Sequence, residues 1–425
     1  MRVAMISEHA SPLACLGGVD SGGQNVYVGQ LAAQLARRGW EVDVFTRRDS
    51  ESLPLEVPWC PGAKVIHVPA GPPQRVRKED LLPFMGSFTE FFIRQARHRR
   101  YELAHANFFM SALVAANAKR SIGLPFVVTF HALGKVRRLH QGNADAFPDE
   151  RLAIEERVAR EADRIIAECP QDEEDLVNHY DADPEKLRII PCGFDPSEFA
   201  PMDQLEARRL IGLEGGGPVI LQLGRMVPRK GVDNVIHGLA RLRRSHGIAA
   251  RLLIVGGETR EPDPLATPEI GRLMGIAQQE EVADAVTFVG SRGRRELRAY
   301  YAAADLFVTT PWYEPFGITP VEAMACGVPV IGAAVGGIQA TVSDNQTGFL
   351  VPPNDPDALA NRMAVLIADM NLRAAMSLAG LQRAHSQYTW AKVADRVARV
   401  YQEARAGARL LPARSGRPLS SAVGS

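Results

Sequence analysis

The sequence predicts an α/β protein with two doubly wound parallel-sheet domains of similar build. Three observations support this prediction. Short β-branched or apolar runs alternate with helical segments along most of the chain, an order typical of parallel sheets covered by helices on both faces. A length of 425 residues exceeds what one hydrophobic core usually organises. A turn-rich stretch, residues 191–201, interrupts the alternation near the middle of the chain and predicts a linker between the domains.

The first domain is expected over residues 1–195, with helices in the gaps between short apolar strands. The helix after the first strand has an apolar face from Val28 to Leu35 and is expected to end near Gly39. The predicted strands of this domain are Val3–Ser7, Val42–Thr46, Val65–Val68, Leu103–Ala106, Phe126–Phe130, Ile165–Ala167 and Leu187–Ile190.

The second domain is expected over residues 203–385, with helices such as Val232–Arg244 and Asp357–Met370. A helix over residues 386–406 carries Trp390, Val397 and Tyr401 at helical spacing and is expected to cross the domain junction. Residues 407–425 are rich in Gly, Pro, Ser and Arg and are expected to be disordered. The predicted strands are Val219–Leu223, Leu252–Val255, Val286–Val289, Leu306–Thr309 and Val328–Ile331.

The composition excludes several classes of function. Lysine plus arginine equal aspartate plus glutamate at 49 each, so the chain has no net field that would attract nucleic acid or acidic lipid. The five cysteines are far apart and form no Cys-x-x-Cys pair, which favours reduced thiols over a metal or redox site. The sequence shows no signal peptide and no apolar run of about 20 residues. We therefore expect a cytoplasmic protein without a nucleic-acid partner or transmembrane segment.

A glycine-rich loop follows the first predicted strand. Residues 17–25 read GGVDSGGQN, and glycines at this place let backbone N–H groups and a helix N-terminus approach a phosphate. The spacing departs from the G-x-G-x-x-G pattern of dinucleotide-binding proteins. A structural turn and an anion site are both open interpretations of the loop.

Two cations follow the first predicted strand of the second domain. Arg225 and Lys230 lie in the segment GRMVPRKG, residues 224–231, at the carboxyl end of that strand. Open parallel sheets bind their ligands at this edge. An arginine can fork onto phosphate oxygens and a lysine adds a point charge, so the pair could neutralise a departing diphosphate. Solvated surface cations remain the alternative.

Two glutamates eight positions apart form the most informative motif. Residues 312–327 read WYEPFGITPVEAMACG, with Glu314 in a loop and Glu322 on the first turns of a helix that Pro320 helps to start. Carboxylates beside a phosphate site would be repelled unless they accept hydrogen bonds from sugar hydroxyls. The motif therefore predicts a nucleotide-sugar site.

This motif resembles that of the retaining GT-B glycosyltransferases of the Glu-x7-Glu type, known as glycosyltransferase family 4 or group 1. The resemblance covers about residues 1–405 and implies two Rossmann-like domains that face a cleft, with a C-terminal helix across the junction. The matching features, in family order, are Gly22-Gly23, His131, Gly224–Gly231, Glu314–Glu322 and Ala334–Gly337.

The resemblance implies roles for individual residues toward the donor, a nucleotide-diphosphate sugar for which UDP-glucose is the favoured example. Glu314 is expected to bind hydroxyls of the transferred hexose, and Glu322 the ribose. Arg225 and Lys230 are expected to hold the diphosphate, and His131 to lie against the sugar. These residues, apart from Glu322, are the catalytic candidates. Further donor contacts are expected from the backbone of Gly23, Phe316 and Gly317, and from Arg292 near the nucleobase.

The resemblance also implies a mechanism in which the acceptor attacks from the face that the diphosphate leaves. No protein nucleophile is then expected, and the leaving phosphate accepts the acceptor's proton. This mechanism requires neither a metal ion nor another cofactor. The Asp-x-Asp from Asp181 to Asp183 precedes Pro184 in a predicted loop and is interpreted as structural.

Two branches of the family resemble the first domain: sucrose-phosphate synthases and the inositol-phosphate glycosyltransferases of mycothiol synthesis. Both branches use polar, phosphorylated acceptors. Lys78 and Arg151 match cationic acceptor positions, and Asn25 is a third acceptor-side candidate. Phe108 and Ala132 stand where the inositol-phosphate enzymes place a tyrosine and a threonine, which disfavours inositol phosphate here. A basic rim of Lys135, Arg137 and Arg138 still favours an anionic acceptor.

Other functions stay open at this stage. An epimerase or hydrolase of the same fold and a non-catalytic sugar-nucleotide-binding protein are the alternatives. An NAD-dependent dehydrogenase would need spaced glycines that the sequence lacks. The domains are expected to close on the donor. The sequence does not select the donor base, the sugar, the acceptor, or whether the chain forms a homo-oligomer.

Overall fold

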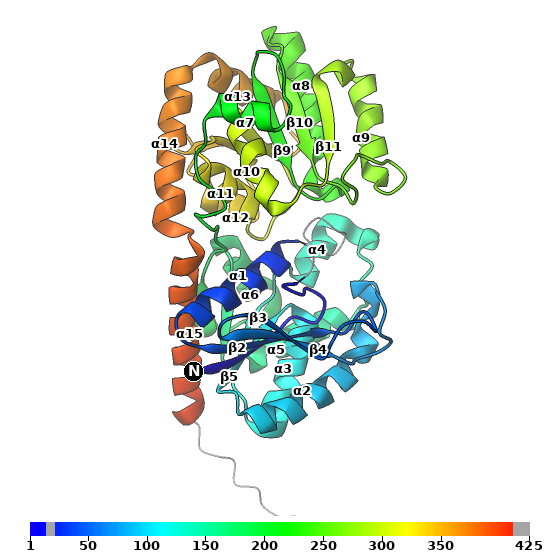
Figure 1. Ribbon diagram of the computed structural model, residues 1–425, viewed down its shortest axis with the longest axis vertical. Helices are drawn as coiled ribbons and strands as arrows, with labels where there is room; N and C mark the ends of the chain where they lie inside the picture. Colours follow the sequence, from blue (N-terminus) through cyan, green and yellow to red (C-terminus); the bar gives the residue numbers. More distant parts are fainter. Residues whose placement is uncertain (14–21, 411–425) are drawn as a thin grey trace, which may run out of the picture.

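The computed structural model describes residues 1–13 and 22–410. Figure 1 shows two α/β domains stacked along the long axis of the molecule. Helix α14 (Met370–Gln387) lies beside the upper domain, and α15 (Trp390–Leu410) lies beside the lower one. The predicted fold class, two parallel-sheet domains with a C-terminal helix across their junction, is confirmed.

The lower domain contains a sheet with the strand order β3-β4-β2-β1-β5-β6-β7-β8. All its neighbours pair in parallel except β3, which runs antiparallel to β4. Strand β3 was not predicted, because this half-exposed edge strand contains Pro58 and lacks an apolar pattern. The strands are β1 (Arg2–Ile6), β2 (Glu41–Arg47), β3 (Glu56–Cys60), β4 (Ala63–Val68), β5 (Leu103–Asn107), β6 (Phe126–Thr129), β7 (Arg164–Ala167) and β8 (Leu187–Ile189).

Helices cover both faces of this sheet, which is why its central strands are continuously apolar. Val3 and Met5 of β1 belong to one core cluster, whereas Ala4 and Ile6 belong to another on the opposite face. The helices of this domain are α1 (Gly23–Arg37), α2 (Met85–Arg99), α3 (Phe109–Ile122), α4 (Gly134–Gln141), α5 (Glu150–Glu161) and α6 (Pro170–Tyr180), with short 3₁₀ turns at Lys78–Asp80, Leu82–Phe84, Gly142–Ala144 and Pro184–Lys186.

The upper domain contains a parallel sheet with the strand order β11-β10-β9-β12-β13-β14. The sequence analysis missed β14, a four-residue strand that begins with a glycine. The elements are α7 (Gln204–Leu210), β9 (Val219–Leu223), α8 (Val232–His246), β10 (Arg251–Val255), α9 (Pro268–Gln279), β11 (Val286–Gly290), α10 (Arg294–Ala303), β12 (Leu306–Thr309), α11 (Ile318–Ala325), β13 (Val330–Ala333), α12 (Gly336–Thr341), β14 (Gly348–Val351) and α13 (Pro356–Ala368), with 3₁₀ turns at Pro228–Lys230 and Ala283–Ala285.

The chain crosses between the domains twice, and the two crossings pair with each other. Phe194 in the linker forms an isolated parallel bridge with Thr389, just before α15. From there α15 returns to the lower domain, where Trp390 is buried against Tyr27. The helix continues to Leu410, four residues into the stretch that was expected to be disordered, and residues 411–425 lie outside the described part of the chain.

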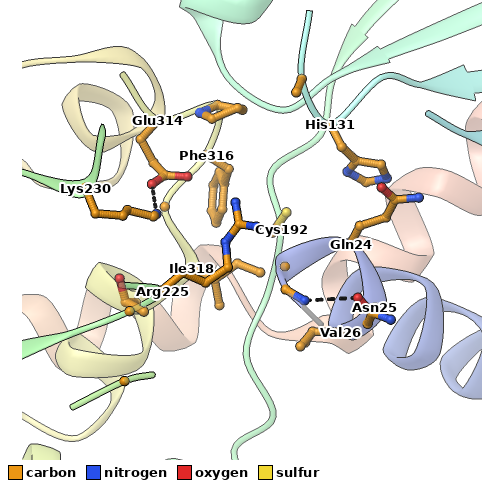
Figure 2. Close-up of a pocket in the computed structure, with 18 of the residues that line it drawn as sticks. Gln24, Asn25, Val26, His131, Cys192, Arg225, Lys230, Glu314, Phe316 and Ile318 are labelled. Carbon is orange, nitrogen blue, oxygen red and sulfur yellow. Dashed lines mark hydrogen bonds and ion pairs between the residues drawn. The ribbon is translucent and has the colours of Figure 1, made fainter. Parts of the chain in front are cut away.

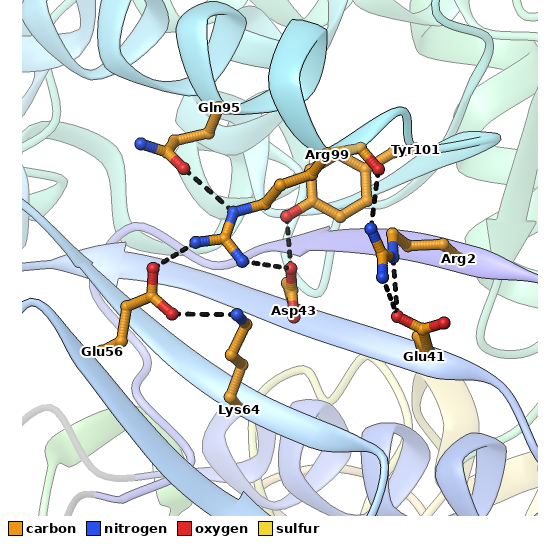
Figure 3. A network of polar contacts seen from close by, with 8 residues as sticks. All are labelled: Arg2, Glu41, Asp43, Glu56, Lys64, Gln95, Arg99 and Tyr101. Carbon is orange, nitrogen blue, oxygen red and sulfur yellow. Dashed lines mark hydrogen bonds and ion pairs between the residues drawn. The ribbon is translucent and has the colours of Figure 1, made fainter.

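Charged and polar side chains close the amino-terminal edge of the lower sheet (Figure 3). Asp43 accepts hydrogen bonds from Tyr101 and Arg99, the latter at 3.5 Å. Lys64 donates to Glu56 at 2.9 Å, and Arg2 donates to Glu41 at 2.7 Å. These side chains form hydrogen bonds with one another at the edge of the sheet opposite the cleft described below.

Among the described residues, no single helix is long and apolar enough to span a bilayer. Helices α13 and α14 reach that length and composition only together, and they meet at a bend of 101°.

Candidate active site

A cleft of about 340 Å³ lies between the domains, where the carboxyl ends of both sheets face each other. The lower domain contributes residues that directly follow its strands, including His9, Phe108, His131 and Glu168. The upper domain contributes the segments that follow β9 to β12. This is the position at which parallel α/β sheets bind ligands, because loops converge there from neighbouring strands.

Lys230 and Glu314 form an ion pair in this cleft (Figure 2). Their side chains are only 17% and 15% exposed. Burial alone would raise the pKa of Glu314, but the charges of Lys230 and Arg229 outweigh it and hold that pKa below its usual value. Burial lowers the pKa of Lys230, and Glu314 offsets only part of that effect. Each charge therefore offsets part of the effect that burial has on the other.

Two glycines let the loop that carries Glu314 pack tightly. A Cβ atom at Gly336 would lie 2.1 Å from the carbonyl oxygen of Glu314, and one at Gly337 would lie 2.3 Å from backbone atoms of Phe316. The N–H of Gly337 donates to that Glu314 carbonyl at 2.9 Å. The glycine pair thus fixes the backbone on which Glu314 stands.

Glu322 lies 2% exposed on α11 and is held by two neighbours. Its carboxylate accepts hydrogen bonds from Arg294 and from the hydroxyl of Tyr301, each at 3.0 Å. Burial raises the pKa of Glu322, although both neighbours act to lower it. Arg294 also pairs with Glu198 in the interdomain linker.

The sequence analysis missed Arg294, which lines the cleft. One of its guanidinium nitrogens is buried without a hydrogen-bond partner in the described structure. A signal was present, because Arg294 is the first residue of α10, where the helix dipole disfavours a cation. A cation at that place indicates a specific carboxylate partner, which here is Glu322.

Arg225 and the start of α1 approach each other across the cleft. A Cβ atom at Gly22 would lie 4.0 Å from the side chain of Arg225, and one at Gly23 would lie 3.3 Å from Ile318. Helix α1 begins at Gly23, so its N-terminal N–H groups face the second domain at this point. The preceding part of the predicted glycine loop, residues 17–21, lies outside the described residues.

His131 faces Glu314 from the lower domain in Figure 2. Its backbone has a positive φ of 59°, a strained conformation for a non-glycine residue that the surrounding contacts must hold. The imidazole Nδ1 lies 3.1 Å from Glu168, and Nε2 lies 3.0 Å from the side-chain oxygen of Asn107. The side chain is 9% exposed.

Other predicted donor residues also line the cleft, namely Gly23, Arg292, Phe316 and Gly317. The guanidinium of Arg292 donates to the Tyr300 hydroxyl at 3.0 Å and to the carbonyl of Arg260 at 2.6 Å. These contacts hold it beside the loop formed by Gly256 and Gly257. Its proposed place near a nucleobase stays a prediction.

The acceptor-side candidates separate into two groups. Lys78 and Asn25 line the cleft, but the side chain of Asn25 caps the N–H of Gly22 at 3.0 Å and donates to Ser11. Arg151 does not line it. Arg151 is 1% exposed and pairs with Glu155, and its guanidinium lies within 5.0 Å of the ring centres of Phe108, Phe109 and Phe147.

The predicted basic rim is neutralised by its own domain. Lys135 pairs with Glu156, Arg137 with Asp145, and Arg138 with Asp149. Only Arg137 of these three cations lines the cleft. The sequence shows these three cations but not their partners, which come from α5 and the loop before it.

A second cavity of about 310 Å³ lies between α4, α6 and the loop before α12. It shares Tyr313 to Pro315 with the first cleft, but its other side contains Asp172. Burial, and then the charge of Glu168, raises the pKa of Asp172 to about 8. In the described residues, no group of three or more His, Cys, Asp or Glu side chains has an arrangement that could hold a metal ion.

Both halves of the chain match known family models. The model described as Glycosyltransferase Family 4 matches residues 21–198, and that of Glycosyl transferases group 1 matches residues 203–383. The first range covers β2 to β8 of the lower sheet, and the second covers β9 to β14 of the upper sheet.

Relatives of the full chain carry related names. The chain is 38% identical over 413 residues to the D-inositol 3-phosphate glycosyltransferase of Actinosynnema mirum, covering 95% of this chain and 97% of that protein. It is 34% identical to the sucrose-phosphate synthase of Thermosynechococcus elongatus, with a TM-score of 0.87 and coverage of 96% and 99%. The HepE protein of Anabaena, solved with UDP-glucose, shares the fold at 21% identity, with a TM-score of 0.73 and coverage of 95% and 99%.

Proposed function

Because the chain belongs to the glycosyltransferases of family 4 and group 1, we propose that it transfers a hexose with retention from a nucleotide-diphosphate sugar to a phosphorylated acceptor. One observation carries this proposal: the partly buried side chains of Lys230 and Glu314 face each other in a cleft to which both domains contribute. A donor can exchange that internal ion pair for two contacts of its own, a phosphate on the lysine and sugar hydroxyls on the glutamate.

The donor is expected to lie along the upper domain. Arg225 and Lys230 bind the diphosphate and offset the charge that develops as it leaves, so no metal ion is needed for that step. Glu322 accepts hydrogen bonds from the ribose, and Arg292 lies beside the base. A UDP-hexose is the donor we favour, and UDP-glucose is the first to test.

Retention follows from attack on the face that the diphosphate leaves. The bond between the anomeric carbon and the phosphate oxygen breaks, the acceptor oxygen bonds to that carbon, and its proton passes to a phosphate oxygen. His131 is poorly suited to take this proton, because its two ring nitrogens face Glu168 and Asn107. We assign His131 to binding the sugar.

The acceptor is expected to lie along the lower domain. Lys78, Arg137 and His9 line this part of the cleft and favour an anionic group. The names of the relatives refer to phosphorylated sugars or inositol. Because Arg151 is enclosed by aromatic rings and Phe108 has no hydroxyl, we favour a sugar phosphate such as fructose 6-phosphate over inositol phosphate.

The test combines a donor screen with the stereochemistry of the product. UDP-, GDP- and ADP-sugars are first assayed for hydrolysis, and the best donor is then offered to fructose 6-phosphate, inositol 3-phosphate and their neutral counterparts. The proposal predicts transfer to a phosphorylated acceptor and the donor's anomeric configuration in the product, read from the anomeric proton coupling. A product with inverted anomeric configuration would contradict the proposal. So would donor hydrolysis without transfer to any of the acceptors.

A further inference from the structure

Glu168 is a buried carboxyl in the cleft that neither sequence motif includes. It directly follows β7, it is 4% exposed, and it lines the cleft together with His131. We propose that Glu168 recognises the transferred hexose: one of its oxygens fixes His131, and the other accepts a hydrogen bond from a sugar hydroxyl. This inference rests on the proposed function of the cleft.

The first oxygen, Oε1, makes two contacts. It lies 3.1 Å from Nδ1 of His131 and accepts a hydrogen bond from the thiol of Cys192, also at 3.1 Å. Burial, and then the charge of Glu168, raises the pKa of this thiol well above its usual value, so Cys192 keeps its proton and remains a donor.

The opposite side of the imidazole is also fixed. The amide nitrogen of Asn107 donates to the carbonyl oxygens of Ile6 and His105, at 3.2 and 3.5 Å, so its side-chain oxygen must accept from Nε2 of His131. Glu168 and Asn107 therefore hold the ring between two acceptors. Glu168 acts here as a positioning residue.

The second oxygen, Oε2, accepts no hydrogen bond from any side chain or backbone group in residues 1–13 and 22–410. Some polar atoms of the protein, such as Oδ2 of Asp145, are fully buried without a hydrogen-bond partner in the described part of the chain, but Oε2 of Glu168 is not one of them. A carboxylate oxygen that has no partner among the described residues and is not enclosed, on a residue that lines the cleft, faces the cleft. It offers an acceptor to a ligand there.

Glu168 and Glu314 approach the same region from opposite domains. Figure 2 shows Cys192 between His131 and Glu314. The charges of both glutamates act on the Cys192 thiol and help to raise its pKa. A sugar whose hydroxyls donate to Glu314 on one side therefore lies within reach of Glu168 on the other. A donor with its full set of hydroxyls would satisfy both carboxylates.

The experiment compares Glu168→Gln with the wild type on UDP-glucose and on its 2-, 3-, 4- and 6-deoxy analogues. The amide keeps the size of the side chain but removes the charge, and hydrogen bonds to charged groups are the stronger ones. We expect kcat/KM for UDP-glucose to fall about 10- to 100-fold. One of the deoxy donors lacks the hydroxyl that Glu168 recognises. For that donor, the kcat/KM values of wild type and variant should differ less than about threefold.

Asp172→Asn is the matched control. Asp172 is a neighbouring buried carboxyl that accepts from the backbone N–H of Glu168 but lines the second cavity. Asp172→Asn should change kcat/KM by the same factor for UDP-glucose and for every deoxy donor. A second variant, Glu168→Asp, keeps the charge and should show the same donor pattern with a smaller loss if the amide variant does not fold.

The outcomes are distinguishable. An equal loss on UDP-glucose and all four deoxy donors, or wild-type kinetics in Glu168→Gln, would overturn the assignment of Glu168. Binding of uridine diphosphate should be unchanged in the variant, because the nucleotide does not reach Glu168 in this arrangement. Failure of the proposed function would instead appear as no turnover of any nucleotide sugar by the wild type itself.

Discussion

The two walls of the cleft treat charge differently. On the donor wall, formed by Arg225, Lys230, Glu314 and Glu322, a cation and a carboxylate neutralise each other across the space that a ligand would enter. On the acceptor wall, formed by His9, Lys78, Phe108, Arg137 and Phe147, the side chains of His9 and Arg137 contact carboxylates of their own domain.

This difference predicts that donor and acceptor are recognised with different strength. A donor that separates Lys230 from Glu314 replaces each lost contact with another, so little free energy is needed to open the pair. An acceptor anion must instead compete with Glu8 for His9 and with Asp145 for Arg137, because both carboxylates belong to the same domain as their partners. We therefore expect strong donor recognition, and an acceptor affinity that is weaker and more dependent on shape.

The largest effect is expected from Lys230→Ala. Loss of this buried cation removes charge stabilisation from the departing diphosphate and leaves Glu314 without its partner, so kcat/KM should fall about 10²- to 10³-fold. Initial rates with saturating acceptor measure this loss. The control is Lys64→Ala, whose lysine pairs with Glu56 in the network of Figure 3, and which should keep wild-type kinetics. Similar rates in both variants would remove Lys230 from the donor wall.

A smaller effect is expected from Arg294→Met. Glu322 would lose its ion pair while remaining buried, so the donor KM should rise about 10- to 30-fold with little change in the acceptor KM. Arg298→Met is the matched control, since Arg298 lies one turn further along α10 and donates only to linker carbonyls. An unchanged donor KM in Arg294→Met would show that Glu322 does not need this partner.

On the acceptor wall, Lys78→Ala should raise the KM of a phosphorylated acceptor about 10-fold and leave the donor KM unchanged. The adjacent Arg77 is an exposed cation that pairs with Glu79 and does not line the cleft, so Arg77→Ala should change neither constant. Parallel loss of donor affinity in Lys78→Ala would contradict the separation of the two walls.

The smallest effect concerns pH. Burial raises the pKa of Glu322, so its carboxylate gains a proton at a less acidic pH than an ordinary glutamate and can then accept fewer hydrogen bonds from the ribose. The affinity for UDP-glucose should fall about threefold or more between pH 8 and pH 5. Calorimetric titration at several pH values measures this change. Glu322→Gln, which has no proton to gain, should bind weakly at every pH.

The residues that line the upper side of the cleft could be predicted from the sequence, whereas the surroundings of those on the lower side could not. Glu314 and Glu322 lie in one continuous segment, and Arg225 and Lys230 lie in another, so local spacing carried the inference. The state of Arg151 depends on Glu155 and on rings from α3 and the loop before α5, which only the folded chain brings together.

The same reasoning explains other differences. The alternation of apolar runs predicted the two parallel sheets, because strands that are buried on both faces are continuously apolar. The edge strand β3 lacks that pattern, and β14 has only four residues and begins with a glycine, so both were missed. Glu168 follows a predicted strand at the edge that binds ligands, but a single carboxylate without a motif does not indicate a site.

The central claim is that a nucleotide donor separates the Lys230 and Glu314 pair. The most direct measurement is a crystal structure of the protein with uridine diphosphate. The account predicts the diphosphate between Arg225 and Lys230, the ribose on Glu322, and Lys230 moved from Glu314 onto phosphate oxygen. A nucleotide bound elsewhere, with the ion pair still closed, would contradict it.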